Sequence, residues 1–140
     1  MEKLHLYLVR HCESLGNREN IFQGQLDLDI SATGEKQLAL LTLRFRNIPI
    51  DAVYSSPLKR AYKTAEAVDL YHSLPIIKLP ELMEVDVGAL SGMKLDKAFA
   101  DYPVFAEKWQ NSPQNCIFPE GETTAEVYDR AKKALARVKA

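Results

Sequence analysis

The apolar run over residues 4–9 constrains the fold of this chain more than any other feature of its sequence. Nearly every residue in the run is apolar or aromatic, which is typical of a strand buried on both faces of a parallel sheet, and such sheets are flanked by helices. The polar residues Arg10, His11 and Cys12 follow at once. Because open α/β sheets build their ligand sites just past the carboxyl ends of their strands, these residues are the first candidates for a functional site.

Further helices and strands are predicted to alternate over the first 80 residues. The expected elements are a helix from Ser31 or Thr33 to Pro49, a strand over residues 50–54, a helix that begins near Pro57, and a strand over residues 76–79. This order predicts an α/β fold of three layers, with a mostly parallel sheet flanked by helices. Residues 16–30 show little periodicity and are expected to form a long functional loop.

The last part of the chain is predicted to be an amphipathic helix. Thr123 and Glu126 have the spacing of a capping box, and an apolar stripe follows them, made of Val127, Ala131, Ala134, Leu135 and Val138. No strand follows that this stripe would cover. We therefore expect residues 1–140 to form a single domain that is C-terminally truncated, with an exposed strand edge that favours self-association.

Charge and composition exclude several classes of partner. The chain has 18 Lys and Arg residues against 19 Asp and Glu residues, a formal net charge of -1, so we expect no binding to nucleic acid or to an anionic membrane surface. No apolar stretch approaches the roughly 18 residues of a membrane span. The two cysteines are far apart and the three histidines are scattered, a pattern that predicts no metal site and favours a reducing, cytoplasmic compartment.

A second polar cluster is expected at the same edge of the sheet, because it follows the strand predicted over residues 50–54. It contains Arg60, and Arg10 and Arg60 together would bind a phosphate group through bidentate hydrogen bonds. Like charge from the two arginines should lower the pKa of His11 and keep its ring neutral and nucleophilic. The carboxyl group of Glu84 would protonate the leaving oxygen and later deprotonate water, in a reaction that needs no metal.

A cysteine nucleophile is an alternative in the same segment. Cys12 and Arg18 have the C-x5-R spacing of cysteine-dependent phosphatases, in which a thiolate attacks phosphorus. Glu13 would repel a phosphate dianion bound there, and the segment has few glycines to let backbone amides converge on it. The residues therefore favour His11 as the nucleophile.

Several motifs, in the same order along the chain, resemble those of one family. They are Leu8-Val9-Arg10-His11-Cys12-Glu13, Phe22-Gln23-Gly24, Ser31-x-x-Gly34, Ser56-Pro57-Leu58-x-Arg60-Ala61-x-x-Thr64-Ala65, Leu82-x-Glu84 with Gly88 and Gly92, and Pro119-Glu120-Gly121-Glu122. Together they resemble the histidine phosphatase superfamily, which has the phosphoglycerate mutase-like fold. The matches are spread over most of the chain, which makes the resemblance specific.

The resemblance implies a phosphohistidine mechanism in which His11 is the nucleophile and Glu84 the proton donor. It also implies a phosphate- and substrate-binding set made of Arg10, Asn17, Gln23, Gly24 and Arg60. The expected function is hydrolysis of a small phosphomonoester, with that substrate or inorganic phosphate as the ligand and without a cofactor. Gly16 and Gln25 stand near the positions where the family's phosphoglycerate mutases have tryptophans, so hydrolysis is favoured, and mutase activity stays open as an alternative.

Two departures from the family pattern leave a further alternative open. Cys12 stands where the family usually has glycine, which reduces the backbone freedom of that turn. The family's phosphate pocket normally includes a second histidine after a later strand, and no histidine follows His72 here. A phosphate-binding module without catalytic activity is therefore the alternative to an enzyme.

Overall fold

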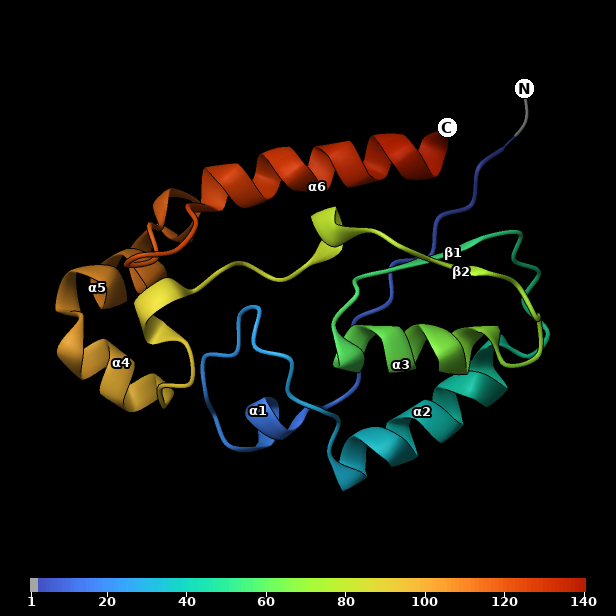
Figure 1. Cartoon of the computed structure of the whole chain (residues 1–140), viewed down its shortest axis with the longest axis horizontal. Helices are drawn as coiled ribbons and strands as arrows, with labels where there is room; N and C mark the ends of the chain where they lie inside the picture. The colour runs from blue at the N-terminus through green and yellow to red at the C-terminus, as the bar shows by residue number, and fades with distance from the viewer. Residues whose placement is uncertain (1–2) are drawn as a thin grey trace.

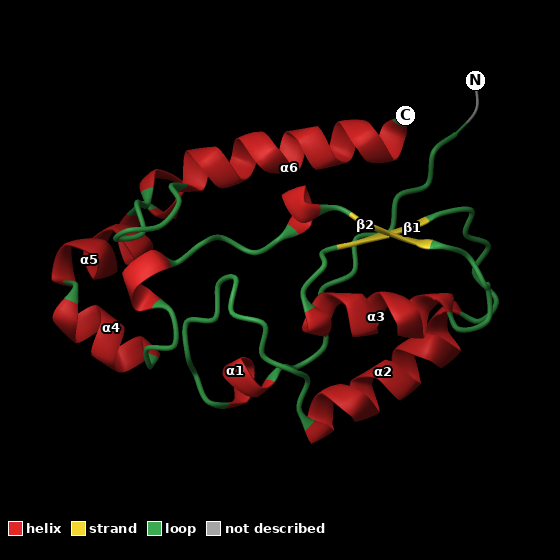
Figure 2. Ribbon diagram, viewed as in Figure 1, coloured by secondary structure: helices red, strands yellow, loops and turns green. Residues whose placement is uncertain are grey.

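A computed structural model describes residues 3–140 of the chain (Figure 1). Its sheet consists, within these residues, of the parallel strands β1 (Val53–Ser55) and β2 (Ile76–Lys78), with Tyr54 opposite Ile77. The helix α3 (Lys59–Asp69) lies between the two strands in sequence and contacts both of them (Figure 2). This β–α–β unit confirms the predicted α/β class, although both strands are shorter than predicted.

The helix α2 (Ala32–Phe45) packs against α3. Of the two predicted starts, Ser31 and Thr33, the helix uses Ser31, whose hydroxyl accepts a hydrogen bond from the backbone N–H of Gly34 at 3.0 Å. Near the C-terminal end of α2, the Thr42 hydroxyl donates to the backbone carbonyl of Ala67 in α3 at 3.0 Å. Ala65 and Val68 of α3 are buried, and so is Leu58 at its N-cap.

The prediction of a buried strand over residues 4–9 is wrong for this structure. The segment forms no strand, and Leu8 is 88% exposed. A strand needs hydrogen bonds from a neighbouring strand, and no part of the described chain pairs with these residues. From this segment, the ring of Tyr7 packs edge-on against Phe45 of α2, with 5.8 Å between ring centroids.

The second half of the chain is mainly helical and has an aromatic core. It contains the 3₁₀ turns η1 (Pro80–Leu82), η2 (Gly88–Leu90) and η3 (Pro113–Asn115) and the helices α4 (Leu95–Asp101) and α5 (Pro103–Asn111). Its core is formed by Phe22, Val87, Leu90, Ala98, Phe105, Cys116 and Phe118. Phe22 comes from the middle of the predicted loop over residues 16–30, which also includes part of the short helix α1 (Leu15–Arg18). This core therefore holds the middle of that loop.

The helix α6 (Thr124–Lys139) begins at the predicted capping box. The Thr123 hydroxyl accepts from the Glu126 N–H at 3.1 Å, and the Glu126 carboxylate accepts from the Thr123 N–H at 2.9 Å. The predicted apolar stripe is only partly covered: Ala134 is buried, whereas Leu135 is 39% exposed. Among the described residues, no helix combines the length and the apolar character that a membrane crossing requires.

Candidate active site

The backbone at Cys12 is tied to α3 through the side chain of Thr64. The Cys12 N–H donates to the Thr64 hydroxyl at 3.0 Å, and this hydroxyl donates to the backbone carbonyl of Arg60 at 2.7 Å. Both hydrogen bonds are buried, so solvent does not compete with them. The two polar clusters that the sequence analysis expected at one edge of the sheet are therefore brought together, with His11 next to the first turn of α3.

The ring of His11 is oriented by its own backbone neighbour. Its Nδ1 lies 2.5 Å from the carbonyl oxygen of Cys12. Because a carbonyl can only accept, Nδ1 carries the proton and Nε2 carries the lone pair when the ring is neutral. Burial lowers the pKa of His11 most, and the charges of Arg60 and Arg10 lower it further, against opposing effects from the Cys12 carbonyl and Glu84. The two arginines were expected to be the main cause of the lowered pKa of His11, whereas desolvation has the larger effect on it.

Arg60 is only 2% exposed and holds the loop over residues 16–30. One terminal nitrogen donates to the carbonyl of Leu26 at 2.9 Å, and the other donates to the carbonyl of Gly24 at 2.7 Å. Burial lowers the pKa of this guanidinium, while the carboxylates of Glu84 and Asp27 raise it. The two carbonyl contacts use two of its five N–H groups, so the other N–H groups can serve an anion.

Two amide side chains of this loop share one partner, the buried hydroxyl of Ser14. That oxygen lies 2.9 Å from Asn17 Oδ1 and 2.7 Å from Gln23 Oε1. Asn17 Oδ1 also accepts from the Ser14 N–H at 2.9 Å. With their oxygen atoms engaged in this way, both amides present their NH₂ groups as donors. Donors of this kind suit the binding of a phosphate oxygen.

Gly24 is placed where a side chain would not fit. Its φ of +49° is in the left-handed region, and a Cβ would lie 2.8 Å from both the Val85 carbonyl and Val87 Cγ2. The close approach brings the loop against the segment that carries Glu84. Gly24 thus shapes the loop and supplies a carbonyl to Arg60.

Glu84 is an exposed residue in the stretch between η1 and η2. Its carboxylate accepts from the Val85 N–H at 2.8 Å, and its backbone carbonyl accepts from Gln25 Nε2 at 3.2 Å. Gly24 links this stretch to Arg60, because its carbonyl accepts from Arg60 and its backbone lies against the Val85 carbonyl. The charge of the Glu84 carboxylate raises the pKa of both His11 and Arg60.

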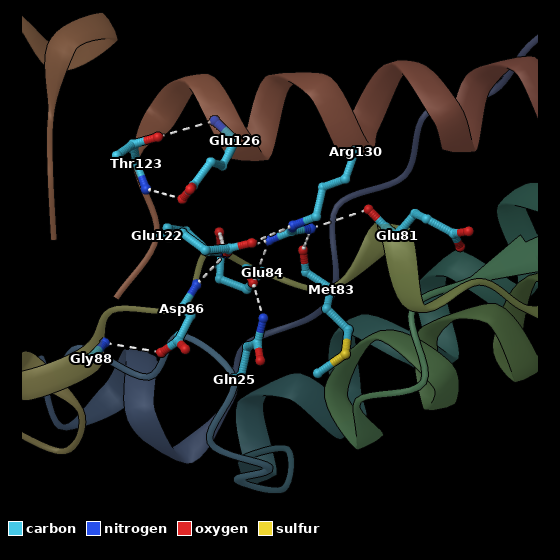
Figure 3. Close-up of polar contacts among 12 residues, drawn as sticks. Gln25, Glu81, Met83, Glu84, Asp86, Gly88, Glu122, Thr123, Glu126 and Arg130 are labelled. Carbon is cyan, nitrogen blue, oxygen red and sulfur yellow. Dashed lines mark hydrogen bonds and ion pairs between the residues drawn. The ribbon is translucent and has the colours of Figure 1, made fainter. Parts of the chain in front are cut away.

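Sequence reasoning missed Arg130, which contacts the backbone of this stretch from α6 (Figure 3). It also pairs with Glu122, whose carboxylate lies 2.7 Å from its guanidinium. The only signal in the sequence was Glu122 in the Pro119-x-Gly121-Glu122 motif. The apolar stripe of this helix gives no indication of the role of a charged residue on it.

Cys12 does not have the environment of a nucleophile. It is 6% exposed, and burial raises the pKa of its thiol. The arginine of the C-x5-R spacing, Arg18, instead pairs with Glu19 on the surface. Cys12 also lacks the positive φ that would call for glycine, and Gly34 leaves space beside it, since a Cβ on Gly34 would lie 3.2 Å from Cys12 Sγ. The expected loss of backbone freedom is therefore not a constraint here.

In the described part of the chain, no three His, Cys, Asp or Glu side chains are grouped to hold a metal ion.

Known proteins resemble this chain in sequence and in fold. Residues 6–140 match the model of the histidine phosphatase superfamily, branch 1. Phosphoserine phosphatase 1 of Hydrogenobacter thermophilus is 40% identical over 134 residues, which cover 96% of this chain and 64% of that protein. The probable phosphoglycerate mutase GpmB of Erwinia tasmaniensis is 33% identical over 132 residues, which cover 94% of this chain and 61% of that protein.

A solved structure gives the same result for the fold. The alpha-ribazole phosphatase from Shigella flexneri superposes with a TM-score of 0.84 at 26% identity, covering 94% of this chain and 65% of that chain. This chain thus spans less than two thirds of the length of each of these three proteins. The motif order, the β–α–β unit and the family match lead to one conclusion: the chain belongs to branch 1 of the histidine phosphatase superfamily.

Proposed function

We propose that this chain carries the phosphoryl-transfer site of a phosphomonoesterase that acts on a small phosphorylated metabolite through a phosphohistidine intermediate. The observation that carries the proposal is the hydrogen-bond chain from Cys12 through Thr64 to the backbone carbonyl of Arg60, which ties the segment of His11 to the helix that carries the buried Arg60. Burial and the neighbouring arginines lower the pKa of His11, so its ring is neutral near pH 7. A neutral imidazole with a free Nε2 lone pair is a competent nucleophile toward phosphorus.

In the first step, His11 Nε2 attacks phosphorus, a P–N bond forms and the P–O bond to the leaving group breaks. Glu84, in its protonated form, gives its proton to the leaving oxygen. In the second step, the Glu84 carboxylate takes a proton from water, the water oxygen attacks phosphorus and the P–N bond breaks. The products are an alcohol and inorganic phosphate, and His11 returns to its neutral state.

The remaining predicted residues fit the binding of the phosphoryl group. Arg60 and Arg10 offset its negative charge, because guanidinium groups match phosphate oxygens in geometry and charge. The NH₂ groups of Asn17 and Gln23 add neutral donors from the loop, and Ser14 keeps them in that orientation. Charge developing on the phosphoryl oxygens thus meets donors that are already in place.

Hydrolysis is favoured over phosphoryl transfer between two hydroxyls of a phosphoglycerate. Relatives are named as phosphatases of phosphoserine and of alpha-ribazole phosphate, and others are named as probable phosphoglycerate mutases. Gly16 packs under Gln23 in this chain, where a Cβ would lie 2.2 Å from the Gln23 side chain. Gln25 donates to the Glu84 carbonyl. Neither position offers the tryptophan that the mutases have there.

A phosphate-binding role without turnover is the second candidate. It needs only the donor groups of Arg60, Asn17 and Gln23, which contacts within the protein already hold in place. Arg10, Arg60, Asn17 and Gln23 would still bind phosphate in such a protein.

The experiment that tests these candidates combines vanadate binding with product analysis on the same preparation. Release of inorganic phosphate from a phosphomonoester panel, lost in His11→Ala and kept in Cys12→Ser, supports hydrolysis. Interconversion of phosphoglycerate isomers supports the mutase. Vanadate binding with neither product supports the non-catalytic role. Turnover that survives in His11→Ala would overturn the assignment of the nucleophile.

A further inference from the structure

The guanidinium of Arg130 is the most heavily engaged cationic group among the described side chains (Figure 3). Its Nε and one terminal nitrogen donate to the two carboxylate oxygens of Glu122, at 2.8 and 2.7 Å. Its terminal nitrogens also donate to three backbone carbonyls, those of Glu81 at 3.1 Å, Met83 at 2.5 Å and Glu84 at 2.9 Å. All three nitrogens are therefore used, in a side chain that is only 18% exposed.

The stretch that Arg130 holds has little regular structure of its own. Residues 83–87 lie between the turns η1 and η2 and form neither helix nor strand. Their backbone is instead held from outside: Asp86 N–H donates to the Glu122 carboxylate at 2.8 Å, and Gln25 donates to the Glu84 carbonyl. Glu122 is thus both the counter-charge of Arg130 and a second anchor for the same stretch.

We propose that Arg130, with Glu122 as its counter-charge, is a positioning residue that fixes the backbone at Glu84 and so sets where the Glu84 carboxyl stands relative to His11 and Arg60. The inference rests on the proposed function for the role of Glu84 as proton donor. It assigns to α6 a part in the chemistry that its apolar stripe does not indicate. Lysine cannot replace this arginine, because one ammonium group with three donors cannot reach a carboxylate fork and three carbonyls at once.

Arg137 supplies a matched control on the same helix. It lies about two turns further along α6 and pairs with the Glu81 carboxylate at 2.8 and 3.0 Å. Its side chain is 53% exposed, and its hydrogen bonds go to that carboxylate rather than to a carbonyl of the stretch. Removing it takes one arginine and one ion pair from the same pair of elements without releasing the backbone at Glu84.

The test uses His11 as an internal reporter, so it does not depend on turnover. Arg10, Arg60 and Glu84 are the charged groups that act on His11, and Glu84 raises its pKa. NMR titration of the imidazole should show a lower pKa in Glu84→Gln. Arg130→Met should lower it by at least half as much, Arg137→Met should leave it unchanged, and Arg130→Met added to Glu84→Gln should lower it no further.

The opposite results overturn the proposal. An unchanged His11 pKa in Arg130→Met means that Glu84 stays in place without its clamp, and a raised pKa means that Arg130 acts on His11 through its own charge. Additive effects in the double variant mean that the two residues act independently. If Arg130→Met does not fold, Arg130→Lys and Glu122→Gln are compared with Arg137→Lys in the same titration. Retention of the native His11 pKa in both of the first two variants excludes the clamp.

Kinetics on an active preparation give a second, independent readout. Protonation of the leaving group belongs to the first step, which kcat/KM reports. A misplaced proton donor should therefore reduce kcat/KM in Arg130→Met far more for an alkyl phosphate than for 4-nitrophenyl phosphate. Arg137→Met should reduce neither. Equal losses on both substrates would contradict a positioning role. Failure of the proposed function would instead appear as turnover that does not need His11, and the titration would still report on the clamp.

Discussion

At Arg60, one guanidinium holds the loop over residues 16–30 and is also the proposed ligand of the phosphoryl group. Its contacts with the Gly24 and Leu26 carbonyls are internal, and its remaining N–H groups can be offered to a ligand. Such a residue is expected to be pre-organised, because burial and the carbonyl contacts fix the group before phosphate arrives. The neighbouring Lys59 is exposed and provides a natural comparison.

Arg60→Ala should therefore weaken the binding of vanadate sharply. Loss of a charge-assisted donor pair costs about 1.5 to 3 kcal/mol, or roughly ten- to a hundredfold in affinity. Lys59→Ala should bind vanadate as the wild type does. Isothermal titration calorimetry on the two variants measures the difference, and equal losses at both positions would indicate a diffuse patch of charge in place of a site.

The lowered pKa of His11 links the site to stability. In the folded chain this pKa lies below the ordinary value of 6.5, so the unfolded chain binds more protons at a pH between the two values. The contribution of His11 to the free energy of unfolding is therefore fully present above pH 6.5 and is lost as the pH falls toward the folded pKa. We predict that His11→Asn flattens this part of the pH profile in urea unfolding. An identical profile in the variant, or an NMR midpoint for His11 above 6.5, would contradict the assignment.

Among the elements, the helices were predicted best, because their signals are local. The caps at Ser31 and Thr123 lie within three residues of the groups that they bind, so the sequence alone located the start of α6 and narrowed that of α2 to Ser31 or Thr33. The run over residues 4–9 failed for the opposite reason, since a strand exists only where a distant segment pairs with it. Its composition showed that it should be buried, and nothing local showed what would cover it.

The residues of the candidate site differ in the same way, because some have a signal in the local sequence and others do not. His11, Arg60 and Glu84 were found because each follows an expected strand or carries a motif. Arg130 was missed because its importance lies in carbonyl groups about 46 to 49 residues away along the chain, which no sequence spacing reveals. The amide orientation of Asn17 and Gln23 depends on Ser14 and was equally hidden.

The capping box of α6 gives a prediction at the scale of this helix. Thr123→Ala removes the hydroxyl that accepts from the Glu126 N–H and should lower the free energy of unfolding by about 1 kcal/mol. Thr33→Ala, at an exposed position in the first turn of α2, serves as the control. Urea unfolding followed by circular dichroism measures both. A loss in the control as large as in Thr123→Ala would show that the cap contributes nothing specific.

In the whole molecule, the site lies where two parts of the chain meet. One part contains β1, β2, α2 and α3, and the other contains the aromatic core with α4 and α5, at the opposite end of the view (Figure 1). The loop over residues 16–30 joins them, since Arg60 of α3 binds its carbonyls and Phe22 enters the aromatic core. The loop lies against the stretch that carries Glu84, the proposed proton donor.

In the proposed mechanism, His11 takes the phosphoryl group from the substrate. Trapping the phosphorylated protein tests this step directly. The chain is incubated with a ³²P-labelled phosphomonoester, quenched, and the labelled peptide is identified by mass spectrometry. We predict a label on His11 that is labile in acid and stable in base, as a phosphoramidate is, absent in His11→Ala and retained in Cys12→Ser. A label on Cys12, or one that persists in His11→Ala, would contradict the account.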